Sequence, residues 1–430
     1  MNLTIHRGTR QIGGSCVEVR SGSDRILLDL GLPLTVPGAD EPPATEQSVQ
    51  ALLTSGVLPR VTGVYAGEKP EVRAVIMSHV HQDHMGLAHF VHADIAVYAT
   101  EGAWALTEAL APFLPLRKAI ANRRTLPLRT PQRFGSLAVT AIPVDHSAPD
   151  AAALLVESNG KRLLYTGDLR AHGRKGYLYG NLIRDLAGTI DTLVVEGTTI
   201  GRPDHEPETE QSLEPAFMRL FSRQRHMTLI FCSAQNLDRI VTVYRAAKRT
   251  QKTLVIDLYT AFTLNKLTCL SDSLPQWDWP EIRMVPWGYQ QLRLNEAGHA
   301  AFVESSKPKW IGKKEMHAHA GGIVLLMRSN RKMADIESEL GDESRLVQVV
   351  WSMWEGYWAE DKYVRPFCET YGIKRDYLHT SGHASWSDLK RLIEGLRPAT
   401  VIPIHTEHAA VFAQHFSNVL LPADGDSLSV

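Results

Sequence analysis

The chain has 430 residues, of which 44% are hydrophobic and 22% are charged. This apolar content excludes a disordered or fibrous protein, and the length indicates two domains or one domain with a large insert. No apolar run approaches the roughly 20 residues that cross a bilayer, and the N-terminal MNLTIHRGTR lacks the apolar core of a secretory signal. Four scattered cysteines without a CxxC pair favour a reduced, cytoplasmic protein.

The formal net charge of −1 does not favour nucleic-acid binding, because phosphate neutralisation supplies much of the affinity for nucleic acids. Basic residues nevertheless gather in two stretches. They are Arg117, Lys118, Arg123, Arg124, Arg129 and Arg133 in the first, and Lys307, Lys309, Lys313 and Lys314 in the second. These two stretches are either ordinary solvated surfaces or, alternatively, the rim of a binding site that contacts the phosphate backbone of a nucleic acid.

Short apolar runs that end in polar residues predict strands along most of the chain. In chain order they are residues 17–20, 25–32, 74–77, 137–144, 162–166, 192–195, 228–231, 253–256, 322–327, 346–351 and 400–404. Most are continuously apolar, which is typical of strands buried on both faces. Helices are expected near Gln47–Leu53 and over Met85–Asp94, Asn236–Arg249 and Trp386–Leu396, so the pattern predicts an α/β fold. Residues 268–320 show no assignable pattern.

The most informative motif is the run His79-Val80-His81-Gln82-Asp83-His84, between a predicted strand and a predicted helix. Histidines two apart at a strand end point into one space, and the following turn presents Asp83 and His84 nearby. Imidazole nitrogens and carboxylate oxygens are the ligands expected for zinc or a similar first-row ion. Packing alone does not explain three histidines and an aspartate in six residues, so a metal site is predicted.

Three later segments also end predicted strands: VDHS with His146, YTGD with Asp168 and PIH with His405. Taken singly, each histidine is more often a structural polar residue than a ligand. A two-metal site, however, needs about seven protein ligands and a shared water. The predicted ligands are His79, His81 and His146 for one ion, Asp83, His84 and His405 for the other, and Asp168 as the bridge.

The motifs HxHxDH, VDH and YTGD, in this order, resemble those of the metallo-β-lactamase fold hydrolases, and residues 12–31 look like that family's first hairpin. Glu196 at a strand end, His383 in GHA and His405 in PIH resemble three motifs of the β-CASP nucleases, a branch that includes ribonuclease J. Residues 231–240 are similar to a strand-to-helix segment of ribonuclease J. The resemblance implies a metallo-β-lactamase αββα sandwich with an inserted α/β β-CASP domain.

The implied domains are residues 1–201 for the first part of the metallo-β-lactamase domain, 202–373 for the β-CASP domain and 374–430 for the closing segment. The substrate is expected in the cleft between the two domains. Residues 327–332 and 351–358 depart from the ribonuclease J pattern, which leaves substrate and direction of cleavage open. Trp354, Tyr357 and Trp358 in the second of these stretches are core aromatics or, alternatively, side chains that stack on bases.

The candidate catalytic residues are Asp83, His383 and Glu196. Two dications polarise a phosphoryl oxygen and lower the pKa of a bridging water enough to supply hydroxide near neutral pH. His383 is then the candidate for protonating the leaving oxygen or for hydrogen bonding to the phosphate; a structural turn histidine is the alternative. Glu196 is expected to orient a ligand imidazole, with an ordinary surface acid as the alternative.

The candidate phosphate-binding residues are Ser233, Gln235, Asn236, Ser381 and Ser385. The first three lie where a predicted strand gives way to a helix, and backbone N–H groups there favour phosphate; a helix cap formed by Ser233 is the alternative. Ser381 and Ser385 flank His383 closely enough to contact the same phosphate, although Ser385 also suits the cap of the following helix, with Asp388 three residues on.

The function favoured by these residues is two-metal-dependent hydrolysis of phosphodiester bonds, by a ribonuclease on single-stranded RNA that acts as a 5′-to-3′ exonuclease, with DNA as a further substrate. A hydrolase of a small ester, thioester or nucleotide is the alternative, and the near-neutral charge favours it. A scaffold that binds RNA or a protein partner without turnover is a third reading, against which the intact ligand set argues. Zinc is the expected metal, with manganese or magnesium as alternatives. The resemblance also implies a homodimer, and the lack of a long apolar run predicts no membrane contact.

Overall fold

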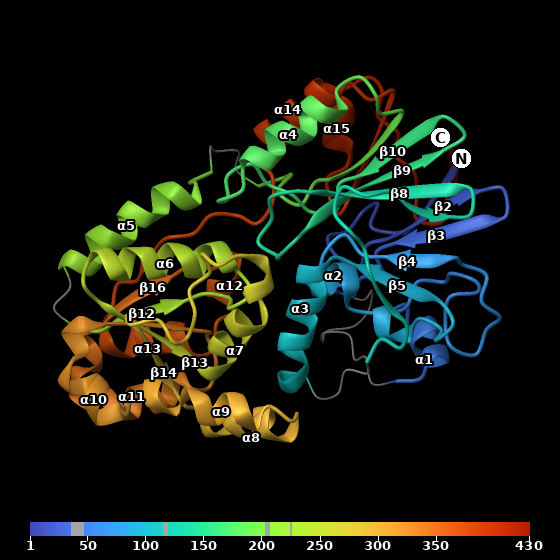
Figure 1. Ribbon diagram of the computed structural model, residues 1–430. Coiled ribbons are helices and arrows are strands. Elements are labelled where there is room, and N and C mark those ends of the chain that lie inside the picture. Colours follow the sequence, from blue (N-terminus) through green and yellow to red (C-terminus); the bar gives the residue numbers. More distant parts are fainter. Residues whose placement is uncertain (36–46, 115–118, 203–206, 224–225) are drawn as a thin grey trace. The chain divides into compact units, whose positions relative to one another are not determined.

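The computed structural model describes residues 1–35, 47–114, 119–202, 207–223 and 226–430 (Figure 1). The chain divides into two compact units. The first unit holds Met1–Trp104, Leu116–Glu206 and Gly382–Val430, and the second holds Ala105–Pro115 and Pro207–Ser381. The domain boundaries expected from the sequence, at 201/202 and 373/374, stay predictions. Arg117 and Lys118 of the first basic stretch lie outside the described residues.

The first sheet of the first unit is mixed. Its strands, in spatial order, are β19 (Ser427–Ser429), β1 (Asn2–Arg7), β2 (Cys16–Ser21), β3 (Asp24–Leu28), β4 (Ala74–Ile76), β5 (Ala96–Ala99) and β6 (Arg123–Thr125). The pairs from β19 to β3 are antiparallel, and those from β3 to β6 are parallel. The carboxyl ends of β3 and β4 therefore lie at the same edge.

The second sheet of this unit is also mixed. Its strands, in spatial order, are β18 (Thr400–Ile404), β11 (Thr192–Glu196), β10 (Lys161–Tyr165), β9 (Ala152–Ser158), β8 (Leu137–Pro143) and β7 (Gln132–Phe134). The pairs among β10, β11 and β18 are parallel, and β8 and β10 both run antiparallel to β9. The carboxyl ends of β8, β10, β11 and β18 therefore meet at one edge of the sheet.

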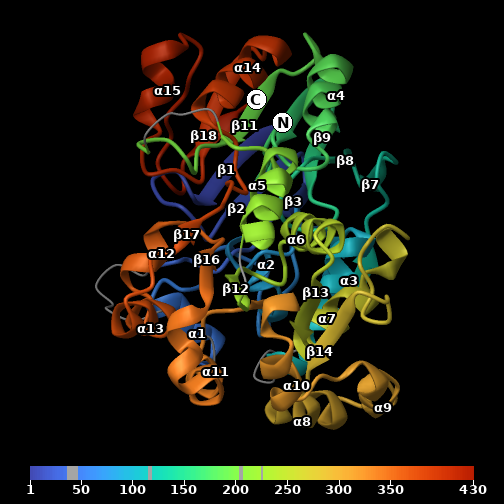
Figure 2. The same cartoon turned by 90° about the vertical axis from the view of Figure 1, so that its left-hand side faces the viewer.

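The two sheets pack face to face through apolar side chains from both, among them Ile5 and Leu28 from the first and Val139 and Leu154 from the second. A second apolar layer lies on the other face of the second sheet. It is covered by α4 (Tyr177–Leu186), α14 (Trp386–Leu396) and α15 (Ala410–His415), as Figures 1 and 2 show. Figure 1 places α1 (Val49–Thr54) and α2 (Gln82–Met85) beside the first sheet. The αββα sandwich expected from the sequence is confirmed.

The second unit is built on a wholly parallel sheet. Its strands, in spatial order, are β14 (Ile282–Val285), β13 (Thr253–Asp257), β15 (Ile323–Met327), β12 (Thr228–Phe231), β16 (Gln348–Trp351) and β17 (Asp376–Tyr377). Apolar side chains on one face pack against α10 (Lys313–Ala318), α11 (Met333–Leu340) and α13 (Val364–Tyr371). The α/β class predicted for this part of the chain is therefore confirmed.

The remaining helices complete the two units. They are α3 (Glu101–Leu110), α5 (Glu210–Arg223), α6 (Leu237–Arg249), α7 (Leu258–Lys266), α8 (Gly288–Glu296), α9 (Ala300–Ser306) and α12 (Gly356–Ala359). The strand β14 and the helices α8, α9 and α10 occupy residues 268–320, where the sequence pattern gave no assignment. None of the described helices is both long enough and apolar enough to cross a membrane.

The helix predicted over Met85–Asp94 is wrong. The helix α2 ends at Met85, and a short 3-10 turn follows at Ala88–Phe90. The physical reason is that neighbouring segments take the backbone donors that a longer helix would use. Leu87 N donates to Leu30 O at 3.0 Å, and His92 N donates to Val64 O at 2.8 Å.

Candidate metal centre

The HxHxDH segment is fixed by the loop that follows β3. Leu30 N donates to His84 O and Leu32 N donates to Gln82 O, both at 2.8 Å. The two backbones approach so closely at Gly31 that a Cβ there would lie 1.7 Å from Asp83 O. Only glycine leaves room for this contact. The glycine after β3 therefore decides where the turn carrying Asp83 and His84 is placed.

Asp29 is the buried carboxylate that orients this segment, and the sequence analysis did not identify it as a site residue. It accepts hydrogen bonds from Ser78 N and Ser78 Oγ, both at 2.7 Å, and from Tyr165 Oη at 2.6 Å. His84 Nδ1 donates to the same carboxylate at 2.7 Å, which directs His84 Nε2 toward Asp168. A carboxylate bound to one ring nitrogen of a histidine is the usual support for a metal-ligating imidazole.

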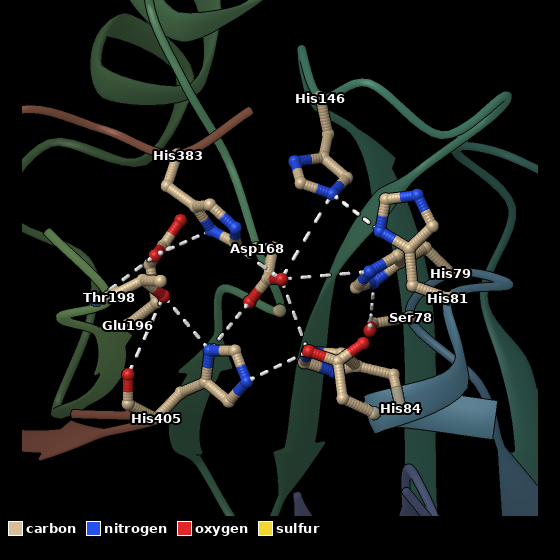
Figure 3. Close-up of polar contacts among 12 residues, drawn as sticks. Ser78, His79, His81, His84, His146, Asp168, Glu196, Thr198, His383 and His405 are labelled. Carbon is tan, nitrogen blue, oxygen red and sulfur yellow. Dashed lines mark hydrogen bonds and ion pairs between the residues drawn. The ribbon is translucent and has the colours of Figure 1, made fainter. Parts of the chain in front are cut away.

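Three histidines form the first cluster of candidate ligands. His79 and His81 follow β4, and His146 follows β8; their ligand atoms lie within 4.8 Å of one another (Figure 3). His146 Nδ1 donates to Gly382 O at 2.5 Å, and Ser78 Oγ lies 3.0 Å from His79 Nδ1. Burial lowers the pKa of all three imidazoles. The neutral form, which can bind a metal, is therefore favoured.

Asp83, His84, Asp168 and His405 form the second cluster, again with their ligand atoms within 4.8 Å of one another. His84 Nε2 lies 3.2 Å from Asp168 Oδ2, and His405 Nε2 lies 3.3 Å from Asp83 Oδ2. Thr198 Oγ1 contacts His405 Nδ1 at 2.9 Å and so fixes the ring from its other side. Four segments that are far apart in the sequence thus meet at the strand ends.

Asp168 touches both clusters. Its Oδ2 lies 3.7 Å from His79 Nε2 and 4.0 Å from His146 Nε2, in addition to its contact with His84 (Figure 3). Burial opposes ionisation of this carboxyl, yet the imidazoles of His84 and His405 hold its pKa well below the usual range. An ionised carboxylate between two groups of imidazoles has the position expected of a bridging ligand.

The charges of the second cluster stabilise one another. Burial alone would lower the pKa of His84, but the carboxylates of Asp168 and Asp29 raise it well above its ordinary value. Burial would raise the pKa of Asp83, whereas its close contact with His405 and the charge of His84 lower it. The cluster therefore holds ionised carboxylates, which are hard oxygen ligands for a divalent cation.

Glu196 and His383 lie beside these clusters. Glu196 is the last residue of β11; its Oε1 accepts from Leu169 N at 2.8 Å, and its Oε2 lies 3.1 Å from His383 Nδ1. The imidazole that Glu196 orients is thus His383, which is not in the predicted ligand sets. Burial opposes protonation, but the charges of Glu196 and Asp168 raise the pKa of His383 to about 9. The ring is therefore a cation at neutral pH.

Two of the candidate phosphate-binding residues act as helix caps. Ser385 is the N-cap of α14 and forms a capping box with Asp388. The N-cap of α6 is Asn236, whose side chain accepts from Arg239 N at 3.2 Å, so the alternative that Ser233 caps this helix is wrong. The side chain of Ser233 instead accepts from Gln235 N at 3.2 Å, because the chain makes a further turn before the helix begins.

The phosphate-binding candidates are divided between the two units. Ser385 belongs to the first unit with the two ligand clusters, whereas Ser233, Gln235, Asn236 and Ser381 belong to the second. Ser385 and His383 therefore lie in the same unit, two residues apart.

The aromatic stretch 351–358 is partly core and partly surface. Trp351 is fully buried, and Trp358 packs against it with 5.0 Å between ring centroids. Trp354 and Tyr357 are exposed by 43% and 60%, which is high for such large apolar side chains. The core interpretation holds for Trp358, and base stacking stays a hypothesis for the other two.

In the second basic stretch, Lys307 and Lys314 are exposed and Lys309 is partly buried. Lys307 Nζ is 2.7 Å from Glu304 Oε2, and Lys309 Nζ donates to Trp279 O at 2.7 Å. Both lysines therefore have partners within their own unit.

The buried polar atoms of the site fit a divalent cation. His79 Nε2, His84 Nε2, both carboxylate oxygens of Asp168 and His405 Nε2 have no hydrogen-bond partner among the described residues. Buried polar atoms are nearly always paired, because leaving one unpaired is costly. Those named here all belong to the two ligand clusters. A cation bound in each cluster would satisfy them.

Family models match two parts of the chain. Residues 53–266 match a beta-lactamase superfamily domain, and residues 373–422 match a Zn-dependent metallo-hydrolase RNA specificity domain. The first segment contains the HxHxDH, VDH and YTGD motifs, and the second contains His383 and His405. The matched regions thus contain all seven candidate ligands.

Several curated relatives are ribonuclease J proteins. That of Helicobacter pylori (strain B128) is 20% identical over 100% of this chain and 60% of its own length. That of Mycobacterium tuberculosis (strain ATCC 25618 / H37Rv) is 22% identical over 94% of this chain and 68% of its own length. An RNase J-like protein of Methanocaldococcus jannaschii is 25% identical over 71% of this chain and 68% of its own length.

A solved structure has the same fold. It is a crystal structure of a protein of unknown function from Enterococcus faecalis V583, with a TM-score of 0.76 and 19% identity. The alignment covers 99% of both chains, so both units are shared.

Proposed function

Since the chain is a β-CASP protein of the metallo-β-lactamase superfamily, similar to ribonuclease J, we propose that it hydrolyses phosphodiester bonds in single-stranded RNA with bound divalent metal ions. One observation carries the proposal: two clusters of ligands share Asp168, and a cationic His383 lies beside them. The chain spans about 60% of the length of the Helicobacter pylori relatives. Its activity therefore needs its own test.

Two ions are proposed, with zinc as the first choice and manganese or magnesium as alternatives. His79, His81 and His146 would hold one ion, and Asp83, His84 and His405 would hold the other, with Asp168 shared. Imidazole-rich sites suit zinc, and the family model that matches residues 373–422 is described as zinc-dependent. When bound, such a pair of ions polarises a phosphoryl oxygen and lowers the pKa of a bound water.

The chain's own residues supply the proton and the orientation. His383 is held by Glu196 and protonated at neutral pH, so it is placed to donate a proton to the leaving oxygen or a hydrogen bond to the phosphate. Asp83 is ionised and lies in the second cluster, where it orients His405. Glu196 acts through His383.

Single-stranded RNA is favoured over a small ester by the relatives and by the RNA specificity model at residues 373–422. The near-neutral charge of the chain is the observation that favours the small ester, thioester or nucleotide as substrate. The test incubates purified protein with 5′-labelled single-stranded RNA, with single-stranded DNA and with a chromogenic ester. Manganese, zinc or EDTA is added in parallel, with Asp168→Ala protein as the control.

RNA cleavage that EDTA and Asp168→Ala both abolish is the expected result. Ester hydrolysis without RNA cleavage would support the alternative. Metal-loaded protein that binds RNA but cleaves none of the three substrates would instead support a binding scaffold without turnover.

Cleavage of RNA is proposed to proceed in the 5′-to-3′ direction. Ser381 and Ser385 would help to bind the terminal phosphate. Both flank His383, and Ser385 also caps α14, so its hydroxyl already accepts one hydrogen bond and contacts Ser387 Oγ at 2.8 Å. We expect mononucleotide products and a preference for 5′-monophosphate over 5′-triphosphate or 5′-hydroxyl ends. Ser381→Ala combined with Ser385→Ala should weaken this preference more than it weakens cleavage. Equal rates on all three ends, with internal fragments as products, would reject the exonuclease.

A further inference from the structure

A buried ion pair connects the two segments that carry His146 and Asp168. Arg170 lies two residues after Asp168, and Asp145 lies one residue before His146. Arg170 Nε donates to Asp145 Oδ1 at 3.2 Å, and Arg170 N donates to Asp145 O at 2.7 Å. Both side chains are 0% exposed. The two segments are thus joined through the main chain and through the side chains at the same pair of residues.

The surroundings of this pair leave it little room to move. Gly173 lies against it so closely that a Cβ there would be 2.4 Å from Asp145 Oδ1 and 2.5 Å from Arg170 Nε. Leu169 N, between Asp168 and Arg170, donates to Glu196 Oε1 at 2.8 Å. The segment that follows Asp168 is therefore held on two sides, by Glu196 and by Asp145.

A buried ion pair is weak evidence for stability, because an apolar pair of similar volume often serves the fold as well. What an ion pair with a directed hydrogen bond adds is a fixed geometry. The geometry fixed here includes the 4.0 Å between His146 Nε2 and Asp168 Oδ2, which joins the first ligand cluster to the shared carboxylate.

We propose that Arg170 is a positioning residue that holds His146 against Asp168 through Asp145, and thereby couples the two metal sites. The inference rests on the metal centre of the proposed function and adds a residue outside its ligand sets. Removing this support should affect the ion bound by His79, His81 and His146 first. His84 and His405 in the second cluster are instead fixed by Asp29 and Thr198.

The test compares Arg170→Lys with Arg239→Lys. Arg239 offers a matched control in the second unit, because it is also 0% exposed and pairs with Glu210, with Nη2 2.9 Å from Oε1. Lysine keeps the charge at both places but loses the Nε donor. Metal affinity is measured by titration of the metal-free proteins with zinc, and the ligand geometry is measured from the visible spectrum of the cobalt-loaded proteins.

We expect Arg170→Lys to bind one of the two ions about 10- to 100-fold more weakly and to change the cobalt spectrum. Arg239→Lys should keep both zinc affinities and the cobalt spectrum, even if its Tm falls as far as that of Arg170→Lys. Wild-type affinities and spectrum in Arg170→Lys would overturn the proposal, and so would an equal loss of metal in Arg239→Lys. Wild-type protein that binds no ion would instead contradict the metal centre.

A second pair of variants keeps the test decisive if Arg170→Lys does not fold. Asp145→Leu with Arg170→Met removes both charges, so no buried charge is left unpaired, and Glu210→Leu with Arg239→Met is its control. The first double variant should fold and bind one ion more weakly, while the control binds both ions normally. A folded first double variant with wild-type zinc affinities would overturn the role of Arg170.

Discussion

In the second unit, the buried guanidinium of Arg239 donates to Glu210, to Ser352 O at 3.2 Å and to Leu378 O at 3.2 Å. In the first unit, Asp168 is as deeply buried, but neither of its carboxylate oxygens has a hydrogen-bond partner among the described residues. The network around Arg239 is complete within the protein, whereas the cluster around Asp168 needs a cation. A buried charge therefore indicates a binding site only where its hydrogen-bonding atoms lack partners within the protein.

Removal of Asp168 should have the largest effect. Asp168→Ala takes away the carboxylate that contacts both clusters, so we expect the metal content to fall from two ions per chain to none and turnover to be lost. Metal analysis after gel filtration measures the content, and circular dichroism checks the fold. Two ions retained at wild-type affinity would show that Asp168 does not bridge them.

His383→Ala should separate metal binding from catalysis. The variant keeps all seven candidate ligands, so we expect two bound ions but a loss of turnover on the order of 10²–10⁴-fold, as for a general acid. His408→Ala removes an exposed histidine three residues after His405 and serves as the control. An unchanged rate would exclude His383 from the mechanism, and lost metal would make it a ligand.

Breaking the Arg239 network should destabilise the second unit without touching the metal centre. Arg239→Met removes the guanidinium that forms the ion pair with the buried carboxylate of Glu210, which should cost about 3–5 kcal/mol of unfolding free energy. Seven of the nine tryptophans lie in this unit, so tryptophan fluorescence during urea unfolding reports on it. Unchanged stability would mean that the pair is not buried in solution.

Glu196→Gln should weaken the orientation of His383 and lower its pKa. We expect a 10- to 100-fold loss of turnover, typical of a residue that positions another. A role for the protonated imidazole predicts that activity falls as pH rises through the pKa of His383, about 9. In Glu196→Gln the fall should begin at lower pH, because the charge that raises this pKa is gone. If activity falls at the same alkaline pH in both proteins, Glu196 does not raise the pKa of His383, and the contact between them is contradicted.

The two helix caps should show the smallest effects. Ser385→Ala and Asn236→Ala each remove an N-cap, from α14 and α6, and each should cost about 1 kcal/mol and lower Tm by roughly 2–4 °C. Differential scanning calorimetry measures the shift. If Ser385 binds the terminal phosphate and Asn236 acts only as a cap, Ser385→Ala alone loses discrimination between 5′ ends. If both variants distinguish the 5′ ends equally well, Ser385 acts only as a helix cap.

The fold class and the two clusters of candidate ligands could be predicted because their signals are local. His79, His81, Asp83 and His84 stand within six residues, and His146, Asp168 and His405 each follow a predicted strand. Parallel strands bring such ends to one edge, so the spacing and the strand pattern together indicated the clusters.

The supporting residues could not be predicted in the same way. Asp29 follows an apolar run as Asp168 does, but nothing in the sequence says that it binds His84 rather than a metal. Thr198 and the carbonyl of Gly382 belong to residue types without a metal signature. The prediction of a helix after His84 was wrong for a related reason. The backbone N–H groups of this segment bond to segments that are distant in the sequence.

Anomalous diffraction from crystals grown with zinc or manganese is the most direct test of the two-metal centre. Two peaks roughly 3.5–4 Å apart are expected. One should lie among His79, His81 and His146, the other among Asp83, His84 and His405, and Asp168 should contact both. Well-diffracting crystals with excess metal and no peak at these residues, or with a peak only elsewhere on the chain, would contradict it.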